Sequence, residues 1–305
     1  AAEGVKPHWR FRLSPDLPHS WVDMVRGESK IDVASLSDPV IRRADGSWLY
    51  MLPSVIDDVD MGVTHVVRGE DHVTNTGIQL QMFAAMGAPA PQFGHAALLT
   101  GADGALSKRL GSVGVEQFRA RGIEPVAVKA LLARLGTSLP VEPVTGDAPL
   151  LETFDLSNLG RATARFDERE LEQLNSRILH HMDYADVADR TPVNEAQWLA
   201  VRGNIASVAE AAEWKAVIEG PVAAPALSDE DHAFVRQAAG VLEALPFGAD
   251  SWGALTGALK DATGRKGKAL FMPLRLALTG REHGPDMAAL LPLIGREQAL
   301  ARLQA

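Results

Sequence analysis

The pattern of apolar and polar residues changes near Val115. Before this residue, short apolar runs alternate with turns that contain glycine or proline, which is typical of strands with occasional helices. After it, apolar residues recur every three to four positions, as they do on helices that bury one face. The pattern therefore predicts an α/β segment followed by an all-α segment.

Residues 1–47 predict a small antiparallel insertion rather than a domain that folds alone. Lys6–Arg12 alternates basic and apolar residues like a short edge strand. Trp21–Glu28 and Asp38–Arg43 are expected to be further strands, and Ala44–Ser47 is expected to be a hairpin-type turn.

A crossover unit of a parallel sheet is predicted next. Met61–Arg68 is rich in Val and Thr and is expected to be a strand buried on both faces. Thr74 or Asn75 is expected to cap a helix over Thr76–Met86, and a strand follows at Phe93–Leu99. Charged residues then fall at the carboxyl ends of the strands, where such sheets bind ligands.

The rest of the chain predicts helices separated by linkers that contain proline or glycine. Asp167–Met182 is the strongest, with Leu171, Leu174 and Ile178 at helical spacing. The other expected helices are Glu116–Gly122, Val126–Leu135, Leu150–Phe154, Leu156–Leu159, Asn194–Val201, Ile205–Val217, Asp229–Leu245, Ser251–Thr263, Lys268–Thr279 and Asp286–Leu303.

Composition narrows the class of protein. The 305 residues have room for two or three domains, and 46% of them are hydrophobic. The sequence has no apolar run of membrane-spanning length and no cysteine, so we expect no membrane partner and no thiolate metal site. A net charge of −9 argues against indiscriminate nucleic-acid binding. A cytoplasmic enzyme or binding protein is the expectation.

Two groups of residues suggest chemistry. Arg68–His72 places a cation, two carboxylates and an imidazole at a strand end, where Arg68 can hold a substrate carboxylate bidentately. The alternative is a solvated turn with a local ion pair. Ser107, Lys108 and Arg109 lie in a glycine-bounded loop after the next strand and suit the phosphates of a nucleoside triphosphate. The alternative is an ordinary basic turn, since the loop lacks the phosphate-loop pattern.

Three further features have structural alternatives. Tyr50 and Ser54 can offer hydroxyls to a ligand, although a core role for Tyr50 is an alternative. Asp57 and Asp58 lie at the end of an apolar run that is expected to be a strand, and they either bind a metal or cap the next turn. A basic cluster contacts RNA phosphates or only aids solubility; it comprises Lys260, Arg265, Lys266 and Lys268, with Arg275 and Arg281 beyond it.

Several motifs occur in the order in which bacterial glutamyl-tRNA synthetases carry them. These are Val66–Thr76, Phe93–His95 and Leu106–Arg109, preceded by Tyr50–His65 and followed by Pro273–Gly280 with Gly284-Pro285. On these residues the chain resembles that family over essentially its whole length, and most closely the alphaproteobacterial form.

The resemblance implies a class I aminoacyl-tRNA synthetase with an α/β part followed by an all-α part. Residues 1–47 would be the remnant of a connective insertion, and 48–103 the second half of a Rossmann-type catalytic domain. Residues 104–188 would hold the signature loop and a helical stem-contact region, and 189–305 an all-helical anticodon-binding region.

The resemblance also implies roles for single residues. Ala105–Arg109 looks like the second signature of the family, Lys-Met-Ser-Lys-Ser. Lys108 would hold the triphosphate during adenylation, with Ser107 as a second catalytic residue and Arg109 as a further ATP contact.

Glutamate would bind at the first cluster. Arg68 would pair with its side-chain carboxylate, and Tyr50 would line the pocket. Ser54 stands where relatives often carry Asn, and His72 stands beside the pocket, where the family varies.

Two departures from the family pattern stand out. The first signature, a His-Ile-Gly-His-type motif, is absent from these residues. The family places it, and the zinc-binding cysteines of some relatives, upstream of the point where this sequence begins. We therefore expect no zinc in this chain and little adenylation by residues 1–305 alone. Ala105 also replaces the first lysine of the second signature, which lowers the charge of that loop by one.

The resemblance implies glutamate–tRNA ligase activity in the cytoplasm, with ATP, Mg²⁺, glutamate and tRNA as cofactors and partners. We expect a monomer and predict no protein ligand for a metal. On charge alone Arg275, Arg281 and Lys266 are candidates for tRNA contact. The alternatives are a non-catalytic RNA-binding fragment and a related synthetase that charges a different tRNA.

Overall fold

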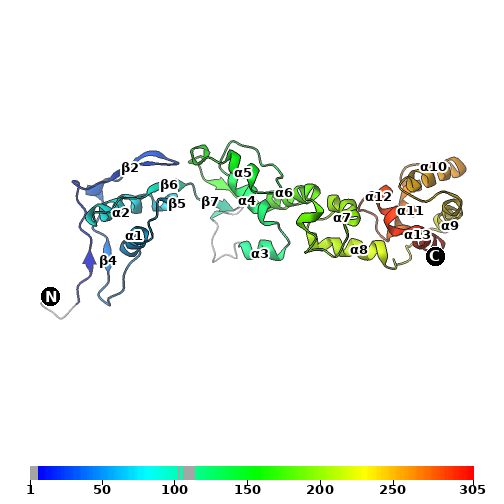
Figure 1. Ribbon diagram of the computed structural model, residues 1–305, viewed down its shortest axis with the longest axis horizontal. Coiled ribbons are helices and arrows are strands. Elements are labelled where there is room, and N and C mark those ends of the chain that lie inside the picture. Colours follow the sequence, from blue (N-terminus) through cyan, green and yellow to red (C-terminus); the bar gives the residue numbers. More distant parts are fainter. Residues whose placement is uncertain (1–5, 102–103, 106–113) are drawn as a thin grey trace. The chain divides into compact units, whose positions relative to one another are not determined.

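The computed structural model describes residues 6–101, 104–105 and 114–305 (Figure 1). The chain forms two compact units. The first consists of Ala1–Ser112, Leu131–Val141 and Ala148–Asp167, and the second of Val113–Ala130, Glu142–Asp147 and Glu168–Ala305. The first unit contains the strands and the second is helical, so the predicted change from α/β to all-α is confirmed.

Small sheets make up much of the first unit. Two strand pairs are antiparallel: β1 (Trp9–Arg10) with β4 (Val40–Arg42), and β2 (Ser20–Asp23) with β3 (Gly27–Lys30). A third pair, β5 (His65–Gly69) with β6 (Gln92–Ala96), is parallel. The last sheet has the order β8-β7-β9, from Gly104–Ala105, Leu99–Gly101 and Ala164–Arg165.

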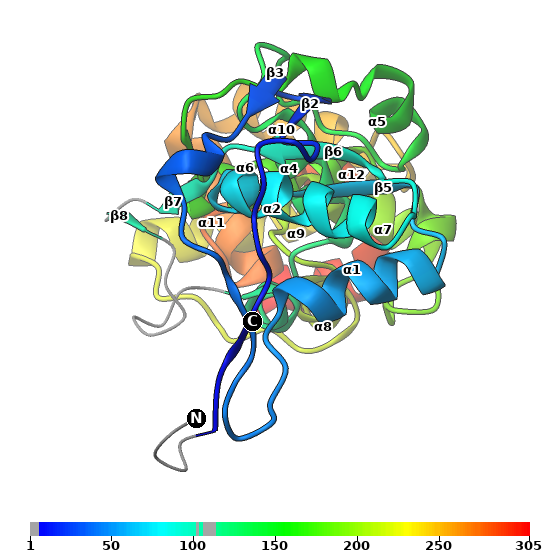
Figure 2. The ribbon, with the colours of Figure 1, turned by 90° about the vertical axis from the view of Figure 1, so that its left-hand side faces the viewer.

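The predicted crossover unit is present and contains the core of this unit. Helix α2 (Val73–Ala85) connects the parallel strands β5 and β6 and buries Met82 and Phe83. Helix α1 (Met51–Asp60) lies beside α2 (Figures 1 and 2) and contributes the fully buried Val55 to the same cluster. The two helices therefore share an apolar core, and their positions at the strands depend on it.

The structure corrects four expectations in the first unit. The run before Asp57 is helix α1 rather than a strand, so Asp57 and Asp58 lie in its last turns. Strand β5 is not buried on both faces, because its side chains alternate and Val67 is 53% exposed. Helix α2 begins at Val73, and its N-cap is His72 rather than Thr74 or Asn75. The run Trp21–Glu28 is part of a hairpin rather than one strand: the turn covers residues 24–26, and Gly27, whose φ is 72°, begins β3.

That hairpin is attached to the parallel pair. The amide of Met24 donates a hydrogen bond of 2.8 Å to the carbonyl of Phe93 in β6. Asp23 is thereby brought beside His95, a residue 72 positions away in the sequence. The antiparallel insertion consequently contributes a side chain to the interior of the parallel unit.

Helices make up the second unit and confirm most of the predicted ranges. They are α3 (Val115–Ala120), α6 (Glu168–His181), α7 (Glu195–Val201), α8 (Ala211–Glu219), α9 (Asp229–Ala244), α10 (Ser251–Thr263), α11 (Lys268–Thr279), α12 (Met287–Ile294) and α13 (Arg296–Gln304). Helix α4 (Pro125–Arg134) is divided between the units, and α5 (Ala148–Thr153) belongs to the first. The expected single helix over Asp286–Leu303 is wrong, because Gly295 breaks it with a φ of 83°.

Buried charges join distant parts of the helical unit. The carboxylate of Glu124 is 6% exposed and accepts hydrogen bonds of 3.0 and 3.1 Å from Arg190. Arg302 donates to the carbonyls of Leu278, Val217 and Gly220, at the ends of α11 and α8. A cation at helix C-termini is favourable because the carbonyl dipoles point toward it. In the described part of the chain, no helix combines the length and apolarity that crossing a bilayer requires.

Replacing Gly284 with alanine is expected to destabilise the helical unit. The φ of Gly284 is 146°, and a Cβ there would overlap the ring of the buried Trp214. We expect a loss of about 2 kcal/mol in the free energy of unfolding, as for other overpacked sites. Urea unfolding followed by helical circular dichroism measures this change.

Gly253→Ala is the matched control. Gly253 lies inside α10, and a Cβ at this position would meet open space, so alanine should stabilise the helix by about 0.5–1 kcal/mol. Equal unfolding midpoints for the two variants would contradict the packing argument.

Candidate functional site

The guanidinium of Arg68 is the centre of a polar network in the first unit. Its Nε donates to His95 Nε2 at 3.3 Å, and one terminal nitrogen donates to the Tyr50 hydroxyl at 3.2 Å. The other terminal nitrogen donates to Thr76 Oγ1 at 2.5 Å and to Gln79 Oε1 at 2.7 Å. Every one of these acceptors is neutral, and no described carboxylate forms an ion pair with Arg68.

Local structure brings these residues together. Arg68 and His95 are register partners on the parallel strands β5 and β6, so their side chains lie on the same face. Thr76 and Gln79 are three residues apart on α2, which places both on one side of that helix. Tyr50 is the residue that precedes α1. Four elements therefore converge on one guanidinium.

Ser54 supports this network from α1. Its hydroxyl donates to the carbonyl of Met51 at 3.1 Å and accepts a hydrogen bond of 2.7 Å from the amide of Gln79. Gln79 thus has its amide nitrogen held by Ser54 and its oxygen directed to Arg68. Because this run is helical, the four-residue spacing of Tyr50 and Ser54 is about one turn, which places both residues on the same side of α1.

The network continues from Arg68 through His95 to Asp23, and these last two residues form a buried pair. Both side chains have 0% exposure, and His95 Nδ1 lies 2.5 Å from Asp23 Oδ2. The indole nitrogen of Trp21 also donates to Oδ2, at 3.1 Å. Three backbone amides donate to Oδ1 at 3.0–3.1 Å; they belong to Val25, Arg26 and His95. A buried carboxylate with this many donors is stable in its ionised form.

The pKa values of the pair follow from these contacts. Burial by itself would raise the pKa of Asp23, but the hydrogen bonds from His95, Arg26, Trp21 and Val25 outweigh it and lower the pKa to about 2. Burial lowers the pKa of His95, against the opposing effect of Asp23, and the charges of Arg68 and Arg26 lower it further. Asp23 is therefore charged and His95 neutral near pH 7.

The predicted cluster Arg68–His72 separates into different environments. Glu70 pairs with Arg26 at 2.6 Å, rather than with Arg68. The ring of His72 meets the Tyr50 ring edge-on at 5.8 Å, and its Nδ1 lies 3.0 Å from the amide of Asn75. Of this cluster, Arg68 and His72 border the Tyr50 side of the network. The cluster is therefore not a solvated turn with one local ion pair. Arg68 is also not free, because four of its N–H groups have partners within the protein.

Two further predictions concern residues around this centre. Asp58 lies in α1. Burial raises its pKa, and the positive charge of Arg68 offsets part of this rise. Ser107, Lys108 and Arg109 lie outside the described residues. Among residues 6–101, 104–105 and 114–305, no group of three or more His, Asp or Glu side chains is placed to hold a metal ion.

The three predicted RNA contacts differ in their surroundings. Arg275 donates to the carbonyl of Pro285 at 2.9 Å, while its other terminal nitrogen is buried without a described partner. Arg281 pairs with Glu213 at 3.0 Å and stacks on Trp214. Lys266 is exposed between α10 and α11. The Arg265 of the same basic cluster is paired with Asp231 and Glu230, which raise its pKa.

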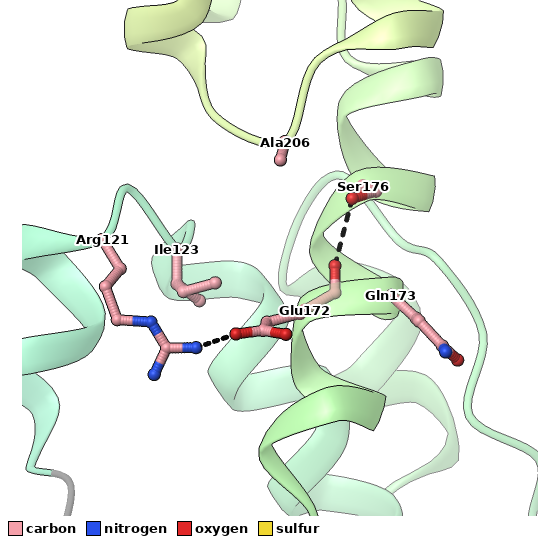
Figure 3. A pocket seen from close by; sticks show the side chains of 6 residues that line it. All are labelled: Arg121, Ile123, Glu172, Gln173, Ser176 and Ala206. Atoms are coloured by element: carbon pink, nitrogen blue, oxygen red, sulfur yellow. Dashed lines mark hydrogen bonds and ion pairs between the residues drawn. The ribbon is translucent and has the colours of Figure 1, made fainter.

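A cavity of about 340 Å³ in the helical unit lies apart from these residues in the sequence (Figure 3). Its lining includes Arg121, Glu172 and Ser176. Arg121 is already paired with Glu168 and Glu172, which raise its pKa, and Ser176 donates to a carbonyl of its own helix. Because these polar groups are satisfied within the protein, the cavity supplies no evident ligand chemistry.

Sequence reasoning assigned no function to four members of the network: Asp23, Thr76, Gln79 and His95. Thr76 and Gln79 are buried polar residues, three positions apart, on a helix whose other buried residues are mostly apolar. His95 lies between Gly94 and Ala96 in β6 and is fully buried. Polar residues at buried positions were therefore the available signal, but their common partner is set by tertiary packing.

Two family descriptions match the chain. The family "tRNA synthetases class I (E and Q), catalytic domain" matches residues 1–173, and "Anticodon binding domain" matches residues 201–305. The curated glutamate–tRNA ligase 1 of Rhizorhabdus wittichii is 63% identical over all of this chain and 69% of its own length. Glutamate–tRNA ligase 2 of Sphingopyxis alaskensis is 60% identical over 99% of this chain and 69% of its own length.

Solved structures share the fold. A glutamate tRNA ligase from Elizabethkingia meningosepticum, in complex with its amino acid, superposes with a TM-score of 0.74 at 24% identity. The match covers 94% of this chain and 66% of that one. Glutamate–tRNA synthetase from Elizabethkingia anophelis gives a TM-score of 0.72. The chain thus spans about two thirds of the length of the proteins it matches.

The contribution of Asp23 to stability is expected to depend on pH. Its folded-state pKa of about 2 is below the ordinary 3.8, so ionised Asp23 stabilises the fold above pH 4, and this stabilisation is lost as pH falls toward 2. The shift corresponds to about 2 kcal/mol. Unfolding free energies of the protein and of Asp23→Asn, measured at several pH values, should converge by that amount between pH 5 and pH 2. A constant difference would contradict the assignment.

Proposed function

The chain belongs to the class I tRNA synthetases for glutamate and glutamine, and we propose that it contributes the glutamate site, one half of the ATP site and the anticodon-binding part of a glutamate–tRNA ligase. Its similarity to glutamate–tRNA ligases extends over its full length. The observation that carries the proposal is the incompletely satisfied Arg68, held beside Tyr50 by neutral partners.

We infer the mode of glutamate binding from the hydrogen-bond donors of Arg68 and Tyr50 that have no partner within the network. A guanidinium has five N–H groups, and four are used by His95, Tyr50, Thr76 and Gln79. The remaining N–H is on the nitrogen that contacts Tyr50, and the Tyr50 hydroxyl still has its own hydrogen to donate. The side-chain carboxylate of glutamate would accept one hydrogen bond from each. This two-residue contact replaces the bidentate arginine contact expected from the sequence.

Ser54 and His72 complete the proposed pocket. The Ser54 hydroxyl already donates to Met51, so it can only accept a further hydrogen bond, and the ammonium group of glutamate is the matching donor. His72 packs its ring on Tyr50 and would limit the width of the pocket on that side.

Activation would follow the chemistry of the family. The α-carboxylate of glutamate would attack the α-phosphorus of ATP and displace pyrophosphate, which gives glutamyl-adenylate. A tRNA hydroxyl would then attack the glutamyl carbonyl carbon and displace AMP. Lys108 and Arg109 would neutralise the charge that develops on the leaving phosphates, and the Ser107 hydroxyl would donate a hydrogen bond to them. Magnesium would accompany the phosphates of ATP, as it does at other nucleotide sites.

The helical unit would bind the tRNA. Arg275 is one candidate, because one of its terminal nitrogens has no described acceptor, and a charged donor without an acceptor is costly. Arg281 and Lys266 would add positive charge near the backbone of the RNA. We also propose that the chain has the four regions 1–47, 48–103, 104–188 and 189–305. The ligase would be a monomer and would act in the cytoplasm, where charged tRNA is used.

Arg68→Lys should weaken glutamate binding by the complete ligase. Lysine keeps the positive charge but lacks the planar fork that contacts four partners, so the KM for glutamate should rise about a hundredfold. Tyr50→Phe removes one hydroxyl and should raise it about tenfold. Aminoacylation assays with varied glutamate, ATP and tRNA measure these constants. An unchanged KM for glutamate in Arg68→Lys would refute the proposed pocket.

Lys108→Ala should slow adenylation without loss of glutamate affinity. Removing a charge that acts as pyrophosphate leaves should lower the rate about a hundredfold. Pyrophosphate exchange in the presence of tRNA measures the rate, and equilibrium binding of glutamate measures the affinity. Equal losses in both would argue against the role. Residues 1–305 alone, which contain no His-Ile-Gly-His-type motif, should show little exchange.

Arg275→Ala should raise the KM for tRNA about tenfold, because a desolvated charge-assisted hydrogen bond is lost. Lys129→Ala is the matched control, since Lys129 is exposed and already paired with Asp147. Filter binding of radiolabelled tRNA gives an independent measure of affinity. If the two variants bind tRNA equally well, Arg275 is not a contact.

A further inference from the structure

We propose that Asp23 and His95 form a positioning device for Arg68: Asp23 fixes the tautomer of His95, and His95 in turn fixes the guanidinium that receives glutamate. The inference rests on the proposed role of Arg68. It extends that role to two buried residues, which the family descriptions do not address and which do not touch the substrate in this arrangement.

The carboxylate determines which nitrogen of His95 carries the proton. An ionised carboxylate only accepts hydrogen bonds, so His95 Nδ1, 2.5 Å from Asp23 Oδ2, must be the protonated nitrogen. Nε2 is then an acceptor. It is the nitrogen that faces Arg68 Nε at 3.3 Å and Thr76 Oγ1 at 2.9 Å. The opposite tautomer would set two N–H groups, of His95 and Arg68, against each other.

Asp23 itself has little freedom to move. Its Oδ1 is held by the three backbone amides of the β2–β3 turn and β6, and Trp21 holds Oδ2. The orientation of the carboxylate is therefore set by the backbone of the hairpin. Through His95, this backbone geometry reaches a side chain on β5 that lies 45 residues beyond Asp23 in the sequence.

Protonation of His95 would disturb Arg68. The charged groups around the imidazole are Asp23 on β2, Arg68 on β5, and Arg26, which is paired with Glu70 after β5. From α2 it meets Thr76, whose hydroxyl can rotate and accept a hydrogen bond. Arg68 has no acceptor. It would lose its Nε partner, and the orientation of its free N–H toward glutamate would no longer be fixed.

Burial and the two arginines lower the pKa of His95 against the effect of Asp23. Loss of glutamate binding should accordingly set in at a pH below the ordinary imidazole range. A site with a neutral His95 is the active form, so the KM for glutamate should be flat near neutral pH and rise on the acid side.

Two substitutions at His95 in the complete ligase test the device. His95→Gln keeps an oxygen acceptor near the position of Nε2 but cannot titrate, and it should retain the KM for glutamate within about threefold. His95→Leu removes the acceptor and should raise that KM at least about tenfold. The KM for ATP should stay unchanged in both. The rise in the KM for glutamate at acid pH should be absent in His95→Gln.

Asp23→Asn tests the device from the carboxylate side, because it should reverse the tautomer of His95. The three backbone amides would select the amide oxygen of the new side chain, so its NH₂ group would face His95 Nδ1. That arrangement reverses the tautomer and should raise the KM for glutamate as much as His95→Leu does. His180→Gln, at an exposed histidine near the end of α6, is the control and should behave like the parent protein.

Nitrogen NMR of histidine-labelled residues 1–305 gives a readout that does not depend on activity. The two nitrogen resonances that disappear in His95→Gln should report a neutral ring protonated at Nδ1. The proposal is overturned if Nε2 carries the proton, or if His95→Leu, while folded by circular dichroism, keeps its KM for glutamate. If Arg68→Lys leaves the KM unchanged, the proposed pocket fails; if only the His95 variants do, this inference alone fails.

Discussion

Arg68 is a permanent positive charge placed at a strand end without an ion-pair partner among the described residues, and the local structure is arranged to hold it. A carboxylate beside it would neutralise the charge and compete with an anionic ligand. Neutral acceptors on α1, α2 and β6 satisfy four of its N–H groups instead. The charge therefore stays available while the side chain keeps one orientation.

This arrangement requires each element to be in register with the others. The pairing of Arg68 with His95 follows from the parallel register of β5 and β6. The position of Gln79 depends on the core shared by α1 and α2, because Ser54 holds its amide. A shift of one residue in the strand pairing would turn either side chain to the opposite face. The geometry of the hydrogen bonds around Arg68 is thus a consequence of core packing.

Carboxylates near Arg68 are paired with other residues and do not contact its guanidinium. Asp23 is ionised, but it contacts the imidazole rather than the guanidinium, and Glu70 is paired with Arg26. The imidazole transmits the orienting effect of the carboxylate and separates the two charges. The same logic appears in the helical unit at Arg302, where helix carbonyls rather than a carboxylate surround a buried arginine. In Arg302 and in Arg275 alike, one guanidinium nitrogen has no described acceptor.

The sequence by itself determined most of the order of elements and the change to helices near Val115, because local periodicity and turn residues specify these features. It also singled out Arg68 as the cation at a strand end. It also contained the motifs on which the resemblance to the family rests. It predicted a strand at α1, although the spacing of Tyr50 and Ser54 suits a helix, because a short apolar run has no clear period. The partners of Arg68 were decided only by tertiary structure. Asp23, Thr76, Gln79 and His95 are far apart or inconspicuous in the chain. Close packing brings Thr76, Gln79 and His95 to one guanidinium, and it brings Asp23 to His95.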